Sequence, residues 1–186
     1  MAERKNAAVL NGKGTEFEPL GILNTAGVQT FDVGAIPDSG ITGTMMAKLL
    51  QKNVRDNGTL GFVLNGYLWE VLYNMVNSSG NYVYRASMDE GKLGKHPYFV
   101  SDAIVVGNGA NVKTSLIFGR WSDLIIADQL DMETRLFDQG SVEDEDGLIS
   151  AIDEDCSILR ILSTHDFGVR HEESFVVAKN IYTKAE

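Results

Sequence analysis

The sequence predicts an α+β fold, with helices concentrated in the first half of the chain and strands in the second. Apolar residues recur at helical spacing in two segments before residue 78. After residue 80, short β-prone runs follow one another with turn residues between them. Because no strand–helix–strand alternation runs through the chain, the second half is expected to be mostly antiparallel, and a doubly wound parallel sheet is not favoured.

The N-terminal segment is expected to form a short helix. Residues 1–11 suit the last turns of a helix, which Gly12 and Gly14 would end because glycine readily adopts the left-handed conformation of a helix stop. Residues 14–24 are expected to be a loop that leads into a short extended piece, and residues 28–33 alternate weakly, as in a strand.

A longer helix with one buried face is predicted to reach about Val54. Thr42 or Thr44 would be its N-cap, because a threonine hydroxyl accepts hydrogen bonds from the free amides of a first turn. The apolar positions of this helix share one face and are Met45, Met46, Leu49, Leu50 and Val54.

A buried strand and a second helix follow the turn pair Asn57-Gly58. Residues 59–65 have the β-rich composition of a buried strand. Residues 66–77 are predicted to be helical, and Ser78-Ser79-Gly80 would end this helix. Its expected apolar stripe consists of Leu68, Trp69, Leu72, Tyr73 and Val76.

The rest of the chain is predicted to form strands around one acidic loop. The predicted strands cover residues 81–85, 96–102, 114–121, 123–128, 132–138, 156–164 and 168–179. Between them, residues 139–155 carry seven acidic side chains, and one helical turn is expected at 147–152.

The composition excludes several classes of protein. The chain has 16 basic and 26 acidic residues and a net charge of -10, which makes it a poor candidate for gripping phosphate backbones. No apolar run approaches the roughly 18–20 residues that span a bilayer, and the charged N-terminus does not look like a signal peptide. The single cysteine, Cys156, excludes an intramolecular disulfide framework and a cysteine-rich zinc site. An intracellular globular protein is expected.

Two glycine-rich stretches and the acidic loop are candidates for phosphate or metal binding. Gly12-Lys13-Gly14 and Gly107-Asn108-Gly109 do not continue into a phosphate-binding motif, so turn-forming glycines explain both. The acidic loop resembles a calcium loop when Gly147 takes the sixth position. Because Val142 then stands where the first ligand belongs, a solvated acidic loop is favoured.

The sequence shows no enzyme signature. His96, His165 and His171 fit no metal-binding spacing and are expected to be structural or at the surface. Cys156 heads an apolar strand beside acidic residues, and a small buried side chain is expected there. No catalytic, cofactor-binding or metal-binding residue is therefore predicted.

Five short segments nevertheless follow one another in a recognisable order. Their matching residues are Pro19, Gly21 and Ile22; Asn65, Gly80 and Tyr82; Leu93, Gly94, Pro97, Val100, Ser101 and Asp102; Phe118, Gly119, Ser122 and Asp123; and Ser174, Phe175, Val176 and Val177. In this order they resemble the C-terminal part of the major capsid proteins of tailed phages, the Hong Kong 97 type. Arg120 departs from this pattern, because the family usually has an acid there.

The resemblance implies a fold of two lobes. An axial (A) lobe with a mixed sheet and flanking helices would take residues 25–130. A peripheral (P) lobe with long antiparallel strands would take residues 1–24 and 131–186. The N-terminal arm, the extended loop and most of the spine helix of the family are expected to be absent.

The resemblance also implies a structural protein of a phage or prophage, and not an enzyme. Such a subunit would self-associate into pentamers and hexamers of an icosahedral shell around double-stranded DNA, with portal and scaffold proteins as further partners. It would need no cofactor, membrane or sequence-specific DNA contact, and would pass from the host cytoplasm into the virion capsid.

Three other functions remain open at this point. One is an encapsulin, a shell of the same fold that encloses an enzyme. Another is a small acidic enzyme or cation-binding protein that uses residues 143–155. The third is an adaptor with a single hetero-partner.

Overall fold

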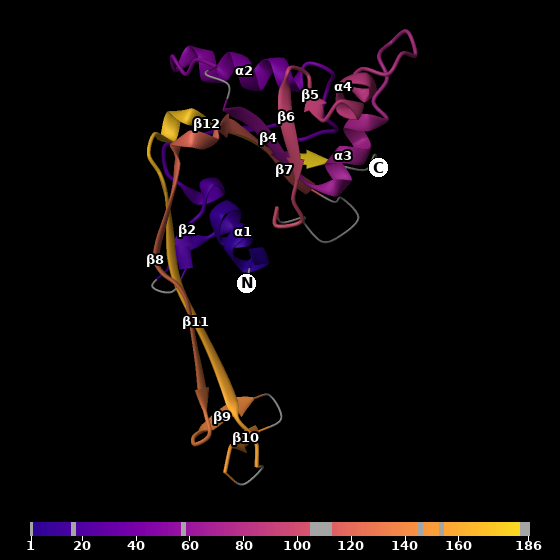
Figure 1. The fold of residues 1–186 in the computed structure, drawn as a ribbon. Coiled ribbons are helices and arrows are strands. Elements are labelled where there is room, and N and C mark those ends of the chain that lie inside the picture. Colours follow the sequence, from indigo (N-terminus) through magenta and orange to yellow (C-terminus); the bar gives the residue numbers. More distant parts are fainter. Residues whose placement is uncertain are drawn as a thin grey trace. The chain divides into compact units, whose positions relative to one another are not determined.

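The computed structural model describes residues 2–15, 18–56, 59–104, 113–144, 147–152 and 155–182 (Figure 1). The chain divides into two compact units, the first formed by Met1–Ile125 with Phe167–Glu186 and the second by Ile126–Asp166. Helices and a mixed sheet build the first unit and strands the second, so the predicted α+β class is confirmed. Among the helices described, none is long and apolar enough to cross a membrane.

The first unit is built around a six-stranded sheet with the order β3-β12-β7-β4-β6-β5. The pairs β12–β3 and β4–β6 are parallel, and the other neighbours are antiparallel. The strands are β3 (Gln29–Asp32), β4 (Leu60–Leu64), β5 (Lys92–Leu93), β6 (His96–Val100), β7 (Lys113–Arg120) and β12 (Phe175–Tyr182). The last strand of the chain thus lies inside the sheet, between β3 and β7.

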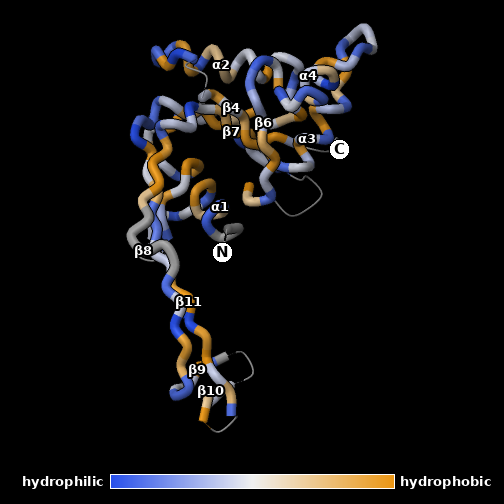
Figure 2. The backbone as a smooth tube through the Cα atoms, in the orientation of Figure 1, coloured by the Kyte–Doolittle hydropathy of each residue, from blue (hydrophilic) through white to orange (hydrophobic). Residues whose placement is uncertain are grey.

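The central strands β4, β7 and β12 are mostly buried. Their successive side chains point to opposite sides of the sheet, so each side has a core of its own. Val176 and Ala178 of β12 pack in one core with α2 (Ile41–Gln51) and α3 (Gly66–Tyr73). Phe175 and Val177 pack in a second core that includes α1 (Ala2–Asn11) and the 3-10 turn η1 (Ile22–Asn24). Figure 1 shows α2 and α1 on opposite sides of the sheet, and Figure 2 shows the hydrophobic course of β4 and β7 between them.

Helix α2 confirms the predicted helix but not its predicted N-cap. The N-cap is Gly40, whose amide donates to Asp38 Oδ1 at 3.0 Å, and not Thr42 or Thr44. The helix starts earlier because Ile41 is buried on the same face as Met45 and Leu49. Of the other predicted core residues, Val54 is buried and Met46 partly buried, whereas Leu50 is 50% exposed.

Helix α3 is shorter than predicted, and no strand forms at residues 81–85. Asn74 ends the helix, because the Asn77 side chain then accepts from the amides of Ser79 and Asn81 at 3.0 Å and builds a turn. Tyr82 makes a single bridge with Val76 before the short helix α4 (Arg85–Asp89) begins.

A small hairpin joins α1 to the sheet. β1 (Lys13–Thr15) pairs antiparallel with β2 (Glu18–Leu20), in the segment that the sequence assigned to a loop and an extended piece. The end of α1 at Asn11 and the positive φ of 67° at Gly14 agree with the predicted helix stop.

The second unit, which we call the ribbon unit, contains strands joined by turns, and no helix occurs among its described residues. β8 (Leu124–Phe137) and β11 (Ile158–Val169) run into it from the first unit and pair with each other. β9 (Ser141–Asp144) and β10 (Gly147–Ser150) form an antiparallel hairpin within it.

Three predictions for this region were wrong. The segments 123–128 and 132–138 are not separate, because one strand, β8, runs unbroken through residues 129–131 between them and pairs with β11. The expected helical turn at 147–152 is the strand β10. The predicted strand 168–179 is broken by the 3-10 turn η3 (Glu172–Ser174), which separates β11 from β12.

Candidate functional site

Two residues of the recognised pattern, Asp123 and Ser174, meet at the start of β8. Asp123 is 7% exposed, and its carboxylate accepts a hydrogen bond from Ser174 Oγ. Arg120 Nη1 lies 3.7 Å from Asp123 Oδ2, and the Arg170 amide donates to the Asp123 carbonyl at 2.8 Å. A buried carboxylate is tolerated where charge and hydrogen bonds compensate its lost hydration. Asp123 therefore ties the β7–β8 turn to the β11–β12 turn.

Two glycines of the pattern are required by close packing. A Cβ at Gly119 would lie 2.3 Å from the Phe175 ring and 2.6 Å from the Ser174 carbonyl oxygen. A Cβ at Gly21 would lie 2.5 Å from the amide nitrogen of Gly12, whose carbonyl accepts from the Gly21 amide at 2.9 Å. These glycines hold β12 against β7 and β2 against the end of α1.

The polar residues of the pattern also have structural partners. Asn65 caps α3 by accepting from the Tyr67 amide at 2.9 Å, and its amide group donates to the Ile104 carbonyl at 3.4 Å. The Ser101 amide donates to the Leu64 carbonyl at 2.8 Å. The pattern thus marks positions that hold the first unit together, and none of these contacts forms a catalytic arrangement.

An aromatic corner lies around the turn that ends α3. The Arg85 guanidinium stands 3.5 Å from the centre of the Tyr82 ring and 4.8 Å from that of Tyr73. Tyr73 Oη donates to Asp89 Oδ1 at 3.1 Å, and this hydrogen bond to a carboxylate raises the pKa of Tyr73. The corner stabilises the turn by cation–π and charged hydrogen-bond contacts.

The three histidines are not brought together. His96 lies 3.6 Å from Asp56, and its ring centre is 5.3 Å from that of Phe118, which agrees with the expected structural role. His165 belongs to β11, whereas His171 is exposed beyond the end of that strand.

Cys156 is exposed, so the prediction of a small buried side chain was wrong. The reason is that β11 begins only at Ile158 and leaves Cys156 in the preceding turn. The apolar run that follows Cys156 does not show whether the strand starts at Cys156 or at Ile158.

The glycine-rich and acidic candidates gain no support as binding sites. Gly107, Asn108 and Gly109 lie outside the described residues, as do Glu145, Asp146, Asp153 and Glu154 of the acidic loop. In the part of the chain that the structure describes, no group of three or more His, Cys, Asp or Glu side chains could hold a metal ion.

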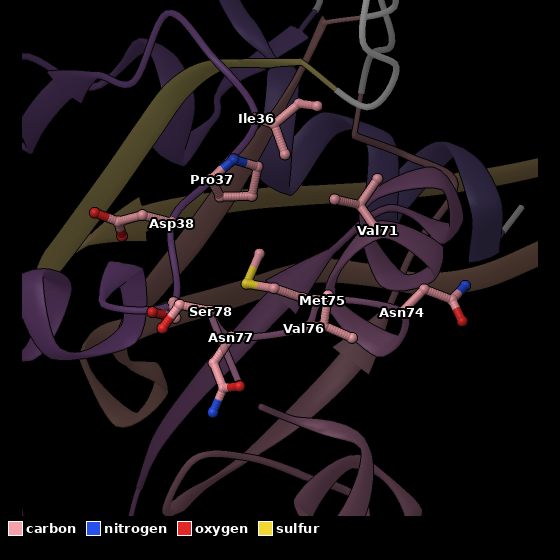
Figure 3. Close-up of a pocket in the computed structure, with 10 residues that line it drawn as sticks. Ile36, Pro37, Asp38, Val71, Asn74, Met75, Val76, Asn77 and Ser78 are labelled. Atoms are coloured by element: carbon pink, nitrogen blue, oxygen red, sulfur yellow. The ribbon is translucent and has the colours of Figure 1, made fainter. Parts of the chain in front are cut away.

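An open hollow lies between the segment before α2 and the turn after α3 (Figure 3). Ile36, Val71, Met75 and Val76 contribute its apolar lining. The titratable group among its lining residues, Asp38, already accepts from the Gly40 amide. The lining offers no nucleophile beside a base, so this hollow lacks the arrangement that acid–base or nucleophilic catalysis needs.

The ribbon unit instead presents an exposed apolar face. Leu136 is 65% exposed, Leu159 57% and Ile161 46%. Leu159 and Ile161 are two residues apart on β11 and so lie on one face of it, and hydrophobic residues recur along both β8 and β11 (Figure 2). Within the ribbon unit, Ala151 is the one buried residue among those whose side chains are described. Sequence reasoning missed this face, although its alternating apolar residues were a usable signal.

Comparisons with known proteins agree with the fold. The chain is 25% identical over 190 residues to the major capsid protein of Klebsiella oxytoca phage phiKO2, covering 97% of this chain and 44% of that protein. It therefore spans less than half the length of this curated relative.

Solved structures show the same fold at low identity. The capsid of an empty GTA particle matches with a TM-score of 0.66 and 15% identity, over 97% of this chain and 61% of that one. A chain of the structure of Gordonia phage Cozz matches with a TM-score of 0.64 and 17% identity, over 100% of this chain and 60% of that one. The SrpI encapsulin of Synechococcus elongatus PCC 7942 matches with 0.60 and 13%, over 100% and 63%.

These matches confirm the expected Hong Kong 97-type fold over the part of the longer chains that this chain spans. The family model of the phage capsid family matches residues 1–180, which is nearly the whole chain. The chain belongs to the phage capsid family.

Proposed function

We propose that this chain is a structural subunit of a phage shell that functions by binding copies of itself. The observation that carries the proposal is the apolar face of the ribbon unit, formed by Leu136, Leu159 and Ile161. An isolated two-stranded ribbon is marginally stable in water, and exposed contiguous apolar surface marks sites of protein association. A neighbouring copy would bury this face and stabilise the ribbon.

The same proposal includes the arrangement expected of the family. Residues 25–130 would form the axial lobe and residues 1–24 with 131–186 the peripheral lobe. Copies would form pentamers and hexamers of an icosahedral shell around double-stranded DNA, with portal and scaffold proteins as partners. The net charge of -10 supports a container that does not grip its DNA.

An encapsulin shell is supported less well than a phage shell. The encapsulin match rests on fold at 13% identity, whereas the sequence-level matches are to the phage capsid family and to a phage major capsid protein.

The proposal is tested by measuring the mass of the purified chain by light scattering over a range of concentrations, with negative-stain images of each sample. Rings or closed shells are expected for the unaltered chain. The double variant Leu159→Ser/Ile161→Ser removes most of the apolar face. The protein concentration that it needs for assembly should therefore be at least about tenfold higher than the concentration that the unaltered chain needs.

Leu50→Ser is the matched control, because Leu50 is a leucine of similar exposure on α2. It should leave both the mass and the unfolding midpoint close to those of the unaltered chain. A monomer at every concentration, or equal assembly of the double variant and the control, would overturn the proposal.

A further inference from the structure

Strand β3 is the outermost strand of the six-stranded sheet, and one of its edges is open. Its neighbour in the sheet is β12, with which it runs parallel. The amide of Val33, the residue after β3, donates to the Lys179 carbonyl at 3.0 Å, so every second residue of β3, counted back from Val33, also faces β12. The main-chain N–H and C=O groups of Thr30 and Asp32 therefore point away from the sheet.

These outward groups have no main-chain partner in the part of the chain that the structure describes. Both Thr30 and Asp32 are exposed, and no main-chain hydrogen bond reaches either of them from another described segment. The extended edge lies between two glycines with positive φ, Gly27 at 92° and Gly34 at 60°. It contains neither proline, lysine nor a bulge, which commonly keep a sheet edge from pairing. The edge is therefore open to one further short strand.

The side chains of β3 are held within its own unit and leave this edge uncovered. Asp32 Oδ2 accepts from Asn180 Nδ2 at 2.8 Å, so its carboxylate leans toward β12 and away from the open edge. On the other face, Gln29 Nε2 donates to the Lys48 carbonyl of α2 at 3.4 Å. Phe31 packs on the same face, against the core that contains α2. The charge of Asp32 therefore does not block pairing at this edge.

The strand that matches this edge in length and in the positions of its free groups is β3 of a second copy. In an antiparallel pair with two-fold symmetry, Thr30 opposite Thr30 would leave Asp32 without a partner in β3. Asp32 opposite Asp32 would place like charges opposite each other, which is destabilising. Thr30 opposite Asp32 pairs all the outward groups of both copies in four hydrogen bonds.

The side chains agree with this third register. The Thr30 hydroxyl of each copy would face the Asp32 carboxylate of the other and can donate to it. Phe31 would face Phe31 of the second copy as a close, non-hydrogen-bonded pair with Cα atoms about 4.5 Å apart. Aromatic pairs at such positions stabilise a sheet. The edge is therefore self-complementary in hydrogen bonds, charge and apolar contact.

We propose that β3 of one copy pairs antiparallel with β3 of a second copy, with Thr30 of each opposite Asp32 of the other. The contact is isologous, since the same edge serves on both sides. A contact of this size is weak between two isolated molecules, but it gains strength where many copies repeat it. The inference goes beyond the proposed function, because it uses the first unit and not the apolar face of the ribbon unit.

Disulfide cross-linking tests the register. Cys156→Ser removes the native thiol, and two variants of this background, Thr30→Cys and Asp32→Cys, are mixed in equal amounts and mildly oxidised. Opposite residues of an antiparallel pair are about 5.5 Å apart and diagonal ones about 7–8 Å. The mixed disulfide should therefore exceed each symmetric disulfide at least about tenfold, as measured by mass spectrometry of the linked peptides. The statistical ratio of random collisions would overturn the proposal.

A control for position uses another exposed residue of the first unit. Lys95→Cys, in place of Asp32→Cys, should give at least about tenfold less mixed product with Thr30→Cys. Equal cross-linking at Lys95 and Asp32 would contradict pairing at the β3 edge.

A matched pair of variants tests the main-chain hydrogen bonds. Phe31→Cys, in the Cys156→Ser background, should form a disulfide with its own copy across the two-fold axis. Thr30→Pro removes the outward N–H but no bond to β12, since the Thr30 amide does not face that strand, and should lower the yield at least about tenfold. Thr30→Val keeps the N–H and should leave the yield within about twofold. Equal yields from the two variants, with unfolding midpoints close to that of Phe31→Cys alone, would overturn the pairing.

The outcomes distinguish this inference from the proposed function. Shells of the unaltered chain together with a random ratio of disulfides would overturn the β3 pairing and leave the proposed function standing. The mixed disulfide should still dominate when Leu159→Ser/Ile161→Ser is added to both variants, and its loss there would contradict a contact made by the first unit. Dominance of the mixed disulfide, with equal assembly of the ribbon variant and the Leu50→Ser control, would support the β3 pairing and overturn the proposed function.

Discussion

Asp123 is an acidic residue of the recognised pattern, and its role in the structure is to stabilise the fold. Its carboxylate is buried, accepts from Ser174 and lies beside Arg120. Asp123→Ala would leave the Ser174 hydroxyl and the Arg120 guanidinium without this partner, and is expected to lower the free energy of unfolding by about 3 kcal/mol. Urea unfolding measures the change. Asp102→Ala, at an exposed carboxylate, should change it by less than about 0.5 kcal/mol, and equal effects would contradict the role of Asp123.

Gly119 and Gly43 provide a matched pair of glycine substitutions. Gly119→Ala would place a methyl group 2.3 Å from the Phe175 ring and should destabilise the chain by about 2 kcal/mol, since a packed core has no room for it. Gly43→Ala meets nothing within 4 Å inside α2 and should stabilise the chain by about 0.5–1 kcal/mol, because alanine favours helix. Thermal unfolding of both variants checks the opposite signs, and a shift in the same direction would be inconsistent with the packing described.

Tyr84 makes part of the stability depend on pH. Burial raises its pKa above the ordinary value of 10.0, and its Oη donates to the Ser39 carbonyl at 2.5 Å. Because the pKa is higher in the folded chain than in the unfolded one, this contribution is complete below about pH 10 and is lost as the pH rises through the folded-state pKa. The difference in unfolding free energy between the unaltered chain and Tyr84→Phe should therefore shrink above pH 10. A difference that stays constant to higher pH would contradict this linkage.

At the scale of elements, the sequence predicted best those helices and strands whose structure follows from their own residues, without contacts to distant parts of the chain. β4 and the buried residues Met45 and Leu49 of α2 follow directly from apolar composition and spacing. The start of α2 could not be located in this way, because the burial of Ile41 outweighed the capping preference of Thr42. Tertiary packing commonly overrides such a local preference.

The ribbon unit could not be predicted because its structure depends on distant pairing. Residues 129–131 lie outside the two predicted strands 123–128 and 132–138, yet β8 continues through them. Likewise, no local pattern places Arg135 next to Arg160, or Asp123 next to Ser174. The recognised pattern identified the second pair only as members of a family motif, without showing that they touch.

At the scale of the whole molecule, the two units differ in what stabilises them. The first has two buried cores on either side of one sheet, whereas the ribbon unit has little buried apolar surface among its described side chains and carries the net charge of -10. Mutual repulsion of its carboxylates further opposes a compact ribbon in a single copy. The stability of the chain is therefore expected to be uneven along its length.

Hydrogen exchange can measure this difference directly. In the unassembled chain, backbone amides of β4, β7 and β12 should exchange only with global unfolding, whereas those of β9, β10 and the adjoining ends of β8 and β11 should exchange at least about 100-fold faster. On assembly, a neighbouring copy would cover the ribbon, and its amides should become protected while those of the sheet change little. Leu159→Ser/Ile161→Ser should abolish the gain, and Leu50→Ser should not. Equal protection of both units in the unassembled chain would show that the ribbon unit is stable without a partner, and would remove the physical reason for its association.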